Sequence, residues 1–153
     1  MSHRTSAILV LALLSLPMLA QAGGKPEVTF INSDKAKAAG YPFSQAVRVD
    51  HTLYLSGQIG VDPATGKLVD GGIGNESRQT MDNIRDLLKE HGHSMSDIVK
   101  CTVMLADIKE WPAFNEVYRG YFNNRFPARS AFAGSGLALD ARVEVECLAV
   151  VGD

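Results

Sequence analysis

The chain has 153 residues, enough for one domain, and its 46% hydrophobic and 21% charged residues are the composition of an ordinary globular protein. That composition argues against wholesale disorder. The formal net charge of −2 gives no electrostatic reason to expect nucleic acid or an anionic membrane as a partner.

The first 22 residues have the three-part pattern of a secretory signal peptide. Arg4 supplies the positive start, an apolar run follows, and "AQA" precedes Gly23. The apolar run, about 14 residues, is shorter than the roughly 20 that a membrane-spanning helix needs, and a signal anchor or buried helix is the alternative. Cleavage after Ala22 would leave 131 of the 153 residues as one exported domain (23–153), periplasmic or secreted and without a membrane anchor. Its formal charge would be −3, because Arg4 is the only charged residue removed.

Alternating apolar and polar residues predict strands in the first part of this domain. "EVTFINS" (27–33) is a short strand, and "AVRVDHTLYLSGQ" (46–58) reads as two strands that meet at Asp50 and His51. The proline and glycine in "VDPATGKLV" (61–69) predict a turn or loop.

A long helix is predicted for "GGIGNESRQTMDNIRDLLKEHG" (71–92), with Asn75 near its start as a cap and Gly92 as a stop. Its apolar residues have helical spacing: Met81, Ile84, Leu87 and Leu88.

The second half of the chain continues with a buried strand, a second helix and two closing strands. "DIVKCTVMLAD" (97–107) has the length and β-branched residues of a strand, and "WPAFNEVYRGYFNN" (111–124) repeats aromatic residues at helical spacing. "ARSAFAGSGLAL" (128–139) and "ARVEVECLAV" (141–150) are strands separated by a turn at Asp140.

These elements predict an α+β fold, a mixed sheet of about six strands with two helices on one face. The opposite, mostly apolar face would be bare, and self-association would cover it.

Cys101 and Cys147 lie in two separate strand-like runs, without metal-ligand or C-x-x-C spacing. The favoured interpretation is two buried free thiols that pack as small hydrophobes. A disulfide stays open, because it would need the two Cα atoms within about 7 Å. The four histidines form no metal-ligand pattern, so no metal site is predicted.

Several polar residues are candidates for chemistry. Arg129 enters a strand after a proline, and Glu144 and Glu146 alternate within a strand, so their side chains share one face. Arg129 could instead form a structural ion pair with a glutamate, and Glu144 could simply be solvated.

Three more residues are candidates with equally simple alternatives. Asn115 lies in the aromatic helix and could cap or bridge a loop. Ser56 and Gly57 begin the stretch "SGQIG" after a strand, where a glycine also suits a β-bulge.

The order and spacing of several motifs resemble the RidA (YjgF) family of reactive-intermediate deaminases. The motifs are "PFSQAVRVDHTLYLSGQIGVDPATGKLV", "RQTMDNIRDLL", "DIVKCTVMLAD", "FNEVYRGYF", "FPARSAF" and "VEVECLAV". The resemblance covers about 41–150, and the combination of "SGQIG", "PARS" and "VEVE" is specific. It implies a chorismate-mutase-like fold and a homotrimer with a cleft at each subunit interface.

The resemblance also implies roles for individual residues. Arg129 of "PARS" would clamp a substrate carboxylate and Glu144 of "VEVE" would position or activate water. Ser56 and Gly57 would line the cleft, where glycine lets main chain approach a small ligand. Asn115 would be a further substrate-binding residue.

Two motif positions depart from the pattern of many active members. Phe43 stands where they have a tyrosine, which removes a hydroxyl, and Ala131 stands where they have a cysteine. Both positions are counted with the substrate-binding cleft.

The implied reaction is hydrolysis of 2-imino or enamine acids to 2-keto acids and ammonia, with a small carboxylate as substrate and no cofactor. The alternatives are a non-catalytic trimer that binds small carboxylates, a chaperone-like trimer, and a ribonuclease. The acidic charge balance disfavours the ribonuclease.

Overall fold

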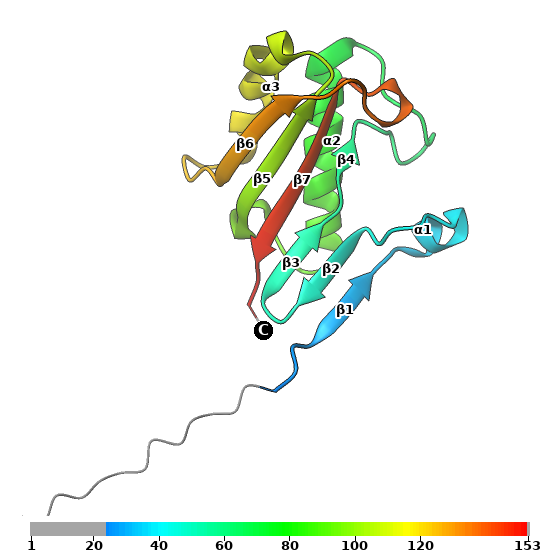
Figure 1. Cartoon of the computed structure of the whole chain (residues 1–153), viewed down its shortest axis with the longest axis vertical. Helices are drawn as coiled ribbons and strands as arrows, with labels where there is room; N and C mark the ends of the chain where they lie inside the picture. The colour runs from blue at the N-terminus through cyan, green and yellow to red at the C-terminus, as the bar shows by residue number, and fades with distance from the viewer. Residues whose placement is uncertain (1–23, 153) are drawn as a thin grey trace, which may run out of the picture.

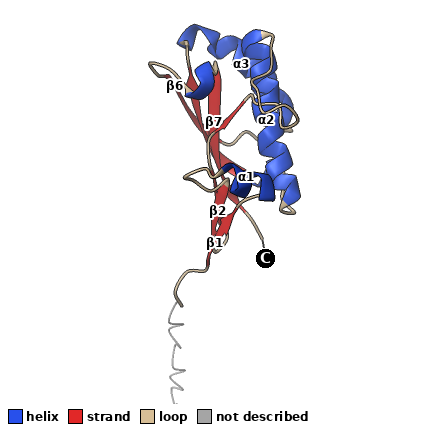
Figure 2. Ribbon diagram, turned by 90° about the vertical axis from the view of Figure 1, so that its right-hand side faces the viewer, coloured by secondary structure: helices blue, strands red, loops and turns tan. Residues whose placement is uncertain are grey.

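The structure, a computed structural model, describes residues 24–152, so the signal peptide predicted for 1–22 lies outside the described residues. A single sheet forms the body of the molecule. The helices α2 (Gly72–Glu90) and α3 (Trp111–Tyr118) cover one of its faces, as the edge-on view of Figure 2 shows. The predicted α+β fold with helices on one side of a mixed sheet is confirmed.

The sheet has seven strands, because a short strand that the sequence pattern did not reveal adds to those predicted. Six strands cross the sheet in the order β1-β2-β3-β7-β5-β6, and β4 pairs with β7 beyond the end of β3 (Figure 1). Within residues 24–152, β5 and β6 are the only paired strands that run parallel. The strands are β1 (Val28–Ile31), β2 (Ala46–Val49), β3 (Thr52–Leu55), β4 (Gln58–Ile59), β5 (Ile98–Leu105), β6 (Ala128–Ala133) and β7 (Val143–Val150).

The predicted pair of strands around Asp50 is a hairpin of β2 and β3. Asp50 has φ 48°, the left-handed conformation that aspartate tolerates better than most residues. Its carboxylate also accepts a hydrogen bond from the Glu27 amide at 2.8 Å. The turn is therefore closed by the residue that interrupts the apolar alternation.

The helix α2 packs its apolar side on the sheet, with Met81, Ile84 and Leu88 fully buried. Asn75 is not the cap that the sequence predicted. The N-cap is Gly71, and the Asn75 side chain donates to the Asp70 carbonyl at 2.9 Å. At the other end the chain leaves through Gly92, as predicted, with φ 79°.

The helix predicted for 111–124 is shorter than its aromatic spacing suggested. α3 ends at Tyr118, and a single 3-10 turn, Arg119–Tyr121, follows. Gly120 lies in this turn, and glycine disfavours a continuing α-helix. A six-residue helix, α1 (Asp34–Ala39), was not predicted because it buries no side chain.

The free thiols favoured for Cys101 and Cys147 are wrong, because the two residues form a disulfide. They lie directly opposite each other on β5 and β7, with Cα atoms 4.1 Å apart. The disulfide is buried in the core and links two neighbouring strands in the middle of the sheet.

The two faces of the sheet differ sharply. The face under α2 and α3 carries the core, including Leu53, Val103 and Val145, whereas no helix of the described residues lies over the other face (Figure 2). Phe30, Tyr54, Phe132 and Val150 alternate with inward-facing residues of their strands and are exposed on this open face. Within residues 24–152, no helix is long and apolar enough to cross a membrane.

Candidate functional site

Ser56 and Gly57 lie where the chain passes from β3 to β4. Both strands pair with β7, but from Tyr54 to Gln58 the chain advances four residues while its partners on β7 advance three. One extra residue is therefore accommodated here, which is the β-bulge that the sequence left open. Such bulges bend a strand and redirect its side chains.

The carboxylate of Glu144 lies directly against Gly57. A Cβ atom built on Gly57 would be 2.0 Å from Glu144 Oε1 and 2.9 Å from its carboxyl carbon, so only glycine leaves room for this contact. Beside it, the Ser56 hydroxyl donates to the Ser44 carbonyl at 2.6 Å. The loop after β3 thus holds a carboxylate close to main chain.

Glu144 is partly buried on the open face of the sheet. Burial raises the pKa of its carboxyl above the usual 4.5, and the negative charge of Glu146, on the same face of β7, raises it further. A carboxyl group with a raised pKa exchanges protons more readily near neutral pH than an ordinary glutamate.

Arg129 lies on the helix face of the sheet, at its edge, within a group of aromatic rings. Its guanidinium carbon is 4.7 Å from the ring centre of Tyr118 and 5.9 Å from those of Phe114 and Trp111. These distances permit cation–π attraction, which fixes the position of the guanidinium.

The N–H donors of Arg129 are open. Within residues 24–152, no carboxylate lies at ion-pair distance from this guanidinium, and its side chain donates no hydrogen bond. The alternative of a structural ion pair with a glutamate therefore has no partner in the described part of the subunit. A fixed cation with free donors is suited to a carboxylate ligand.

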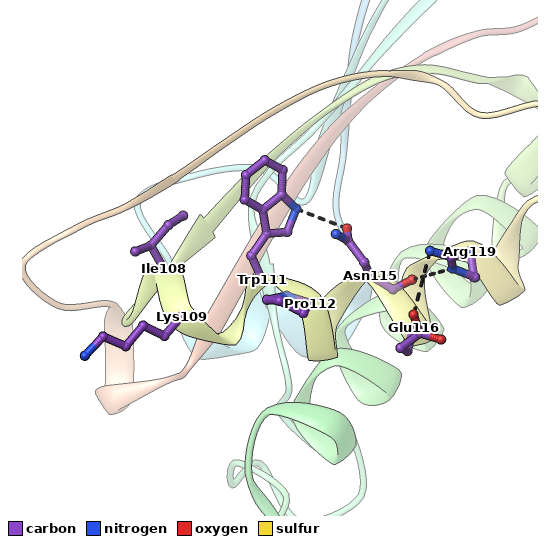
Figure 3. Close-up of a pocket in the computed structure, with 7 residues that line it drawn as sticks. All are labelled: Ile108, Lys109, Trp111, Pro112, Asn115, Glu116 and Arg119. Atoms are coloured by element: carbon purple, nitrogen blue, oxygen red, sulfur yellow. Dashed lines mark hydrogen bonds and ion pairs between the residues drawn. The ribbon is translucent and has the colours of Figure 1, made fainter.

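Asn115 lines a surface pocket of about 520 Å³ at the start of α3 (Figure 3). Its side-chain oxygen accepts a hydrogen bond from Trp111 Nε1 at 3.1 Å. Trp111 also contacts Arg129, so one indole connects the two polar residues. Ala131 follows Arg129 by two residues on β6, faces the same side and packs against the core.

Phe43 lies in the loop before β2, next to Ser44, and its side chain is 55% exposed. Its ring stacks on that of Tyr41, with centroids 5.2 Å apart. Because Phe43 precedes Ser44, whose carbonyl accepts the Ser56 hydroxyl, the main chain at Phe43 is close to Ser56.

The predicted site residues therefore form two groups, and one subunit does not bring them together. The first group is Phe43, Ser56, Gly57 and Glu144, and the second is Asn115, Arg129 and Ala131. Glu144 alternates with the buried Val143 and Val145 and so points to the open face, whereas Arg129 contacts rings of α3 on the helix face. The sheet separates the two groups.

Two contributors were missed from the sequence. Trp111 and Tyr118 were counted only as parts of an amphipathic helix, yet they hold Arg129. The sequence signal was weak, since it shows only an arginine in the strand that follows an aromatic helix. No group of three or more metal-ligating side chains occurs in the part of the chain that the structure describes.

Residues 33–151 match the family described as endoribonuclease L-PSP. Among curated relatives, the 2-iminobutanoate/2-iminopropanoate deaminases of Capra hircus and Homo sapiens are 49% and 45% identical over 122 residues. Each alignment covers 80% of this chain and 89% of the relative.

The chain is also similar to solved structures, in both fold and sequence. RidA from the Antarctic bacterium Psychrobacter sp. PAMC 21119 is 36% identical with a TM-score of 0.74, covering 80% of this chain and 99% of that chain. E. coli TdcF with bound serine is 30% identical with a TM-score of 0.69, covering 73% and 90%.

Proposed function

This chain belongs to the RidA (YjgF) family, and we propose that it hydrolyses reactive 2-imino acids to 2-keto acids and ammonia. The observation that carries the proposal is the guanidinium of Arg129, which is fixed by aromatic rings and has open donors. The names of relatives at 45–49% identity support the same reaction.

The residues have complementary roles in this reaction. The planar guanidinium of Arg129 binds the substrate carboxylate through two parallel hydrogen bonds. Glu144 takes a proton from water as the water oxygen adds to the imine carbon, and passes this proton to the nitrogen. It then moves the proton of the new hydroxyl to the nitrogen in the same way, so that the C–N bond breaks, ammonia leaves and the C=O bond forms. Holding the imine and the water together lowers the entropic part of the barrier.

The separation of the two groups supports a site built between copies of this chain. Arg129 and Glu144 cannot meet on one ligand within a subunit, because the sheet lies between them. A homotrimer would bring Glu144 of one copy toward Arg129 of the next. The exposed apolar residues of the open face, such as Phe30 and Tyr54, would gain cover in the same assembly.

A subunit-mixing experiment tests both proposals. Arg129→Lys and Glu144→Gln chains would be prepared separately, then unfolded and refolded together, and hydrolysis would be measured with imines generated in situ by an amino-acid oxidase. Each pure variant should be slow. Random trimers should regain about one quarter of wild-type activity, because that share of interfaces combines an intact Arg129 with an intact Glu144.

The controls separate the possible outcomes. Each variant refolded alone measures the background, and light scattering should give three times the chain mass. Slow mixed trimers would place both residues in one subunit's site. Wild-type protein that binds 2-oxobutanoate without imine hydrolysis would support a carboxylate-binding protein instead.

The raised pKa of Glu144 predicts the acid limb of the pH profile. If the ionised carboxyl is the proton acceptor, kcat/KM should fall as pH falls through a pKa above 4.5. Glu146→Gln removes the neighbouring negative charge, so the pKa of Glu144 should fall and the acid limb should move to lower pH. The pKa should stay above its usual value, because burial, the larger cause of the rise, remains. Glu144→Gln should slow turnover, remove the limb and leave carboxylate affinity intact. A limb unmoved in Glu146→Gln would contradict this assignment.

Gly57→Ala should displace Glu144, because the new Cβ atom would occupy the position of its carboxylate. The expected loss in kcat is roughly 10- to 100-fold, part of what acid–base groups contribute. Gly74→Ala is the matched control, since nothing lies within 4 Å of that position and alanine suits a helix. Equal activity in both variants would show that the contact with Gly57 does not position Glu144.

We also propose that the chain is exported after cleavage at Ala22. The pattern of residues 1–22 and the disulfide support this, since disulfides persist in oxidising compartments. Mass spectrometry of protein from the producing cell should find a chain that begins at Gly23, whereas an intact chain in the cytoplasm would refute export.

A further inference from the structure

The side chain of Trp111 holds two polar groups at once. Its ring lies under the guanidinium of Arg129, at 5.9 Å from centroid to guanidinium carbon. Its N–H donates to Asn115 Oδ1 at 3.1 Å, as Figure 3 shows. Trp111 is 39% exposed, so much of its surface is not used for core packing.

The chemistry of this hydrogen bond fixes the orientation of the Asn115 amide. An indole N–H can only donate, so the atom that it meets must be the carbonyl oxygen and not the nitrogen. The Asn115 NH₂ group is therefore turned away from Trp111. Within residues 24–152 this NH₂ group makes no hydrogen bond, so its donors are available beside the pocket.

We propose that Trp111 is a positioning residue that presents Asn115 as a hydrogen-bond donor to the same ligand that Arg129 binds. The inference rests on the proposed deaminase function. The guanidinium of Arg129 and the NH₂ group of Asn115 then both offer donors, and the substrate must place oxygen acceptors against both. Substrates with a carboxylate and a further oxygen, as hydroxyl or carboxylate, suit this arrangement, whereas an ammonium group does not.

A double-mutant cycle tests this inference with Trp111→Phe, Asn115→Ala and the combined variant. Phenylalanine keeps a ring under Arg129 but lacks the N–H donor. Trp111→Phe should raise the Kd of 2-oxobutanoate and the KM of the imine roughly 3- to 10-fold, as expected for one hydrogen bond, with kcat less affected. Because Trp111 acts through Asn115, the combined variant should match Asn115→Ala alone.

The alternative outcomes each refute a defined statement. If the increases in Kd of the two single variants multiply in the combined variant, Trp111 acts independently of Asn115 and the inference is wrong. The inference is also wrong if Trp111→Phe leaves the Kd of 2-oxobutanoate unchanged. Melting temperatures should agree among all variants. If Trp111→Phe does not assemble, the wild-type Asn115 side-chain amide resonances give the second readout, and they must shift when 2-oxobutanoate binds.

The same measurements keep the failure of the inference separate from that of the proposed function. Wild-type protein that binds 2-oxobutanoate but does not hydrolyse imines would refute the deaminase, while the Kd cycle would still test Trp111. Active wild-type protein with an equally active Trp111→Phe variant would refute the inference alone.

Discussion

Arg129→Lys is expected to lower kcat/KM for imine hydrolysis about 30- to 1,000-fold in a folded protein. Lysine keeps the charge but replaces a planar two-pronged donor with a point charge. The loss corresponds to about 2–4 kcal/mol of transition-state stabilisation, the range of a charge-assisted bidentate contact. Activity, the Kd of 2-oxobutanoate and the melting temperature would be measured together.

The matched control is Arg85→Lys, on an exposed part of α2 where the guanidinium pairs with Asp82 and Asp86. It should leave activity unchanged. A well-folded Arg129→Lys variant with unchanged carboxylate affinity would mean that the ligand binds elsewhere. A lower melting temperature with activity lost only in proportion to the folded fraction would make Arg129 a structural residue.

Removing the disulfide is expected to cost about 4 kcal/mol of unfolding free energy. This is the chain-entropy value for a loop of 46 residues, the separation of Cys101 and Cys147. For a domain of this size the melting temperature should fall by roughly 10–20 °C. Both a reductant and the double replacement Cys101→Ala, Cys147→Ala should have this effect.

The double variant supplies the control for the reductant. Its melting temperature should not change when reductant is added, and all samples need the same protein concentration because association would stabilise the proposed trimer. Thiol titration of the denatured wild-type protein should detect no free thiol. Two free thiols in protein from the producing cell would contradict the disulfide.

The regular elements were predictable because their signals are local. The alternation of Glu144 and Glu146 against Val143 and Val145 identified a strand with one buried face, and the structure confirms it. The spacing of the apolar residues in α2 was equally informative. The six residues of α1 carried no such signal, because none of them is buried.

The features that the sequence did not reveal depend on how distant strands pair. Cys101 and Cys147 each read as a buried apolar residue, and only the register of β5 against β7 places them opposite each other. Likewise, alternation shows which residues of a strand share a face but not which face the helices cover. The placement of Arg129 and Glu144 on opposite faces could therefore not be predicted.

The central position of β7 has a consequence for how the chain is made. β7 follows β1 to β6 along the chain, yet within residues 24–152 it joins the β1-β2-β3 group to the β5-β6 pair, which do not pair with each other (Figure 1). Until Val143–Val150 leaves the ribosome, the sheet exists only as two unjoined parts. The complete sheet can therefore form only once β7 is available to pair with both groups, so the contacts that complete this fold are long-range ones that form late in folding.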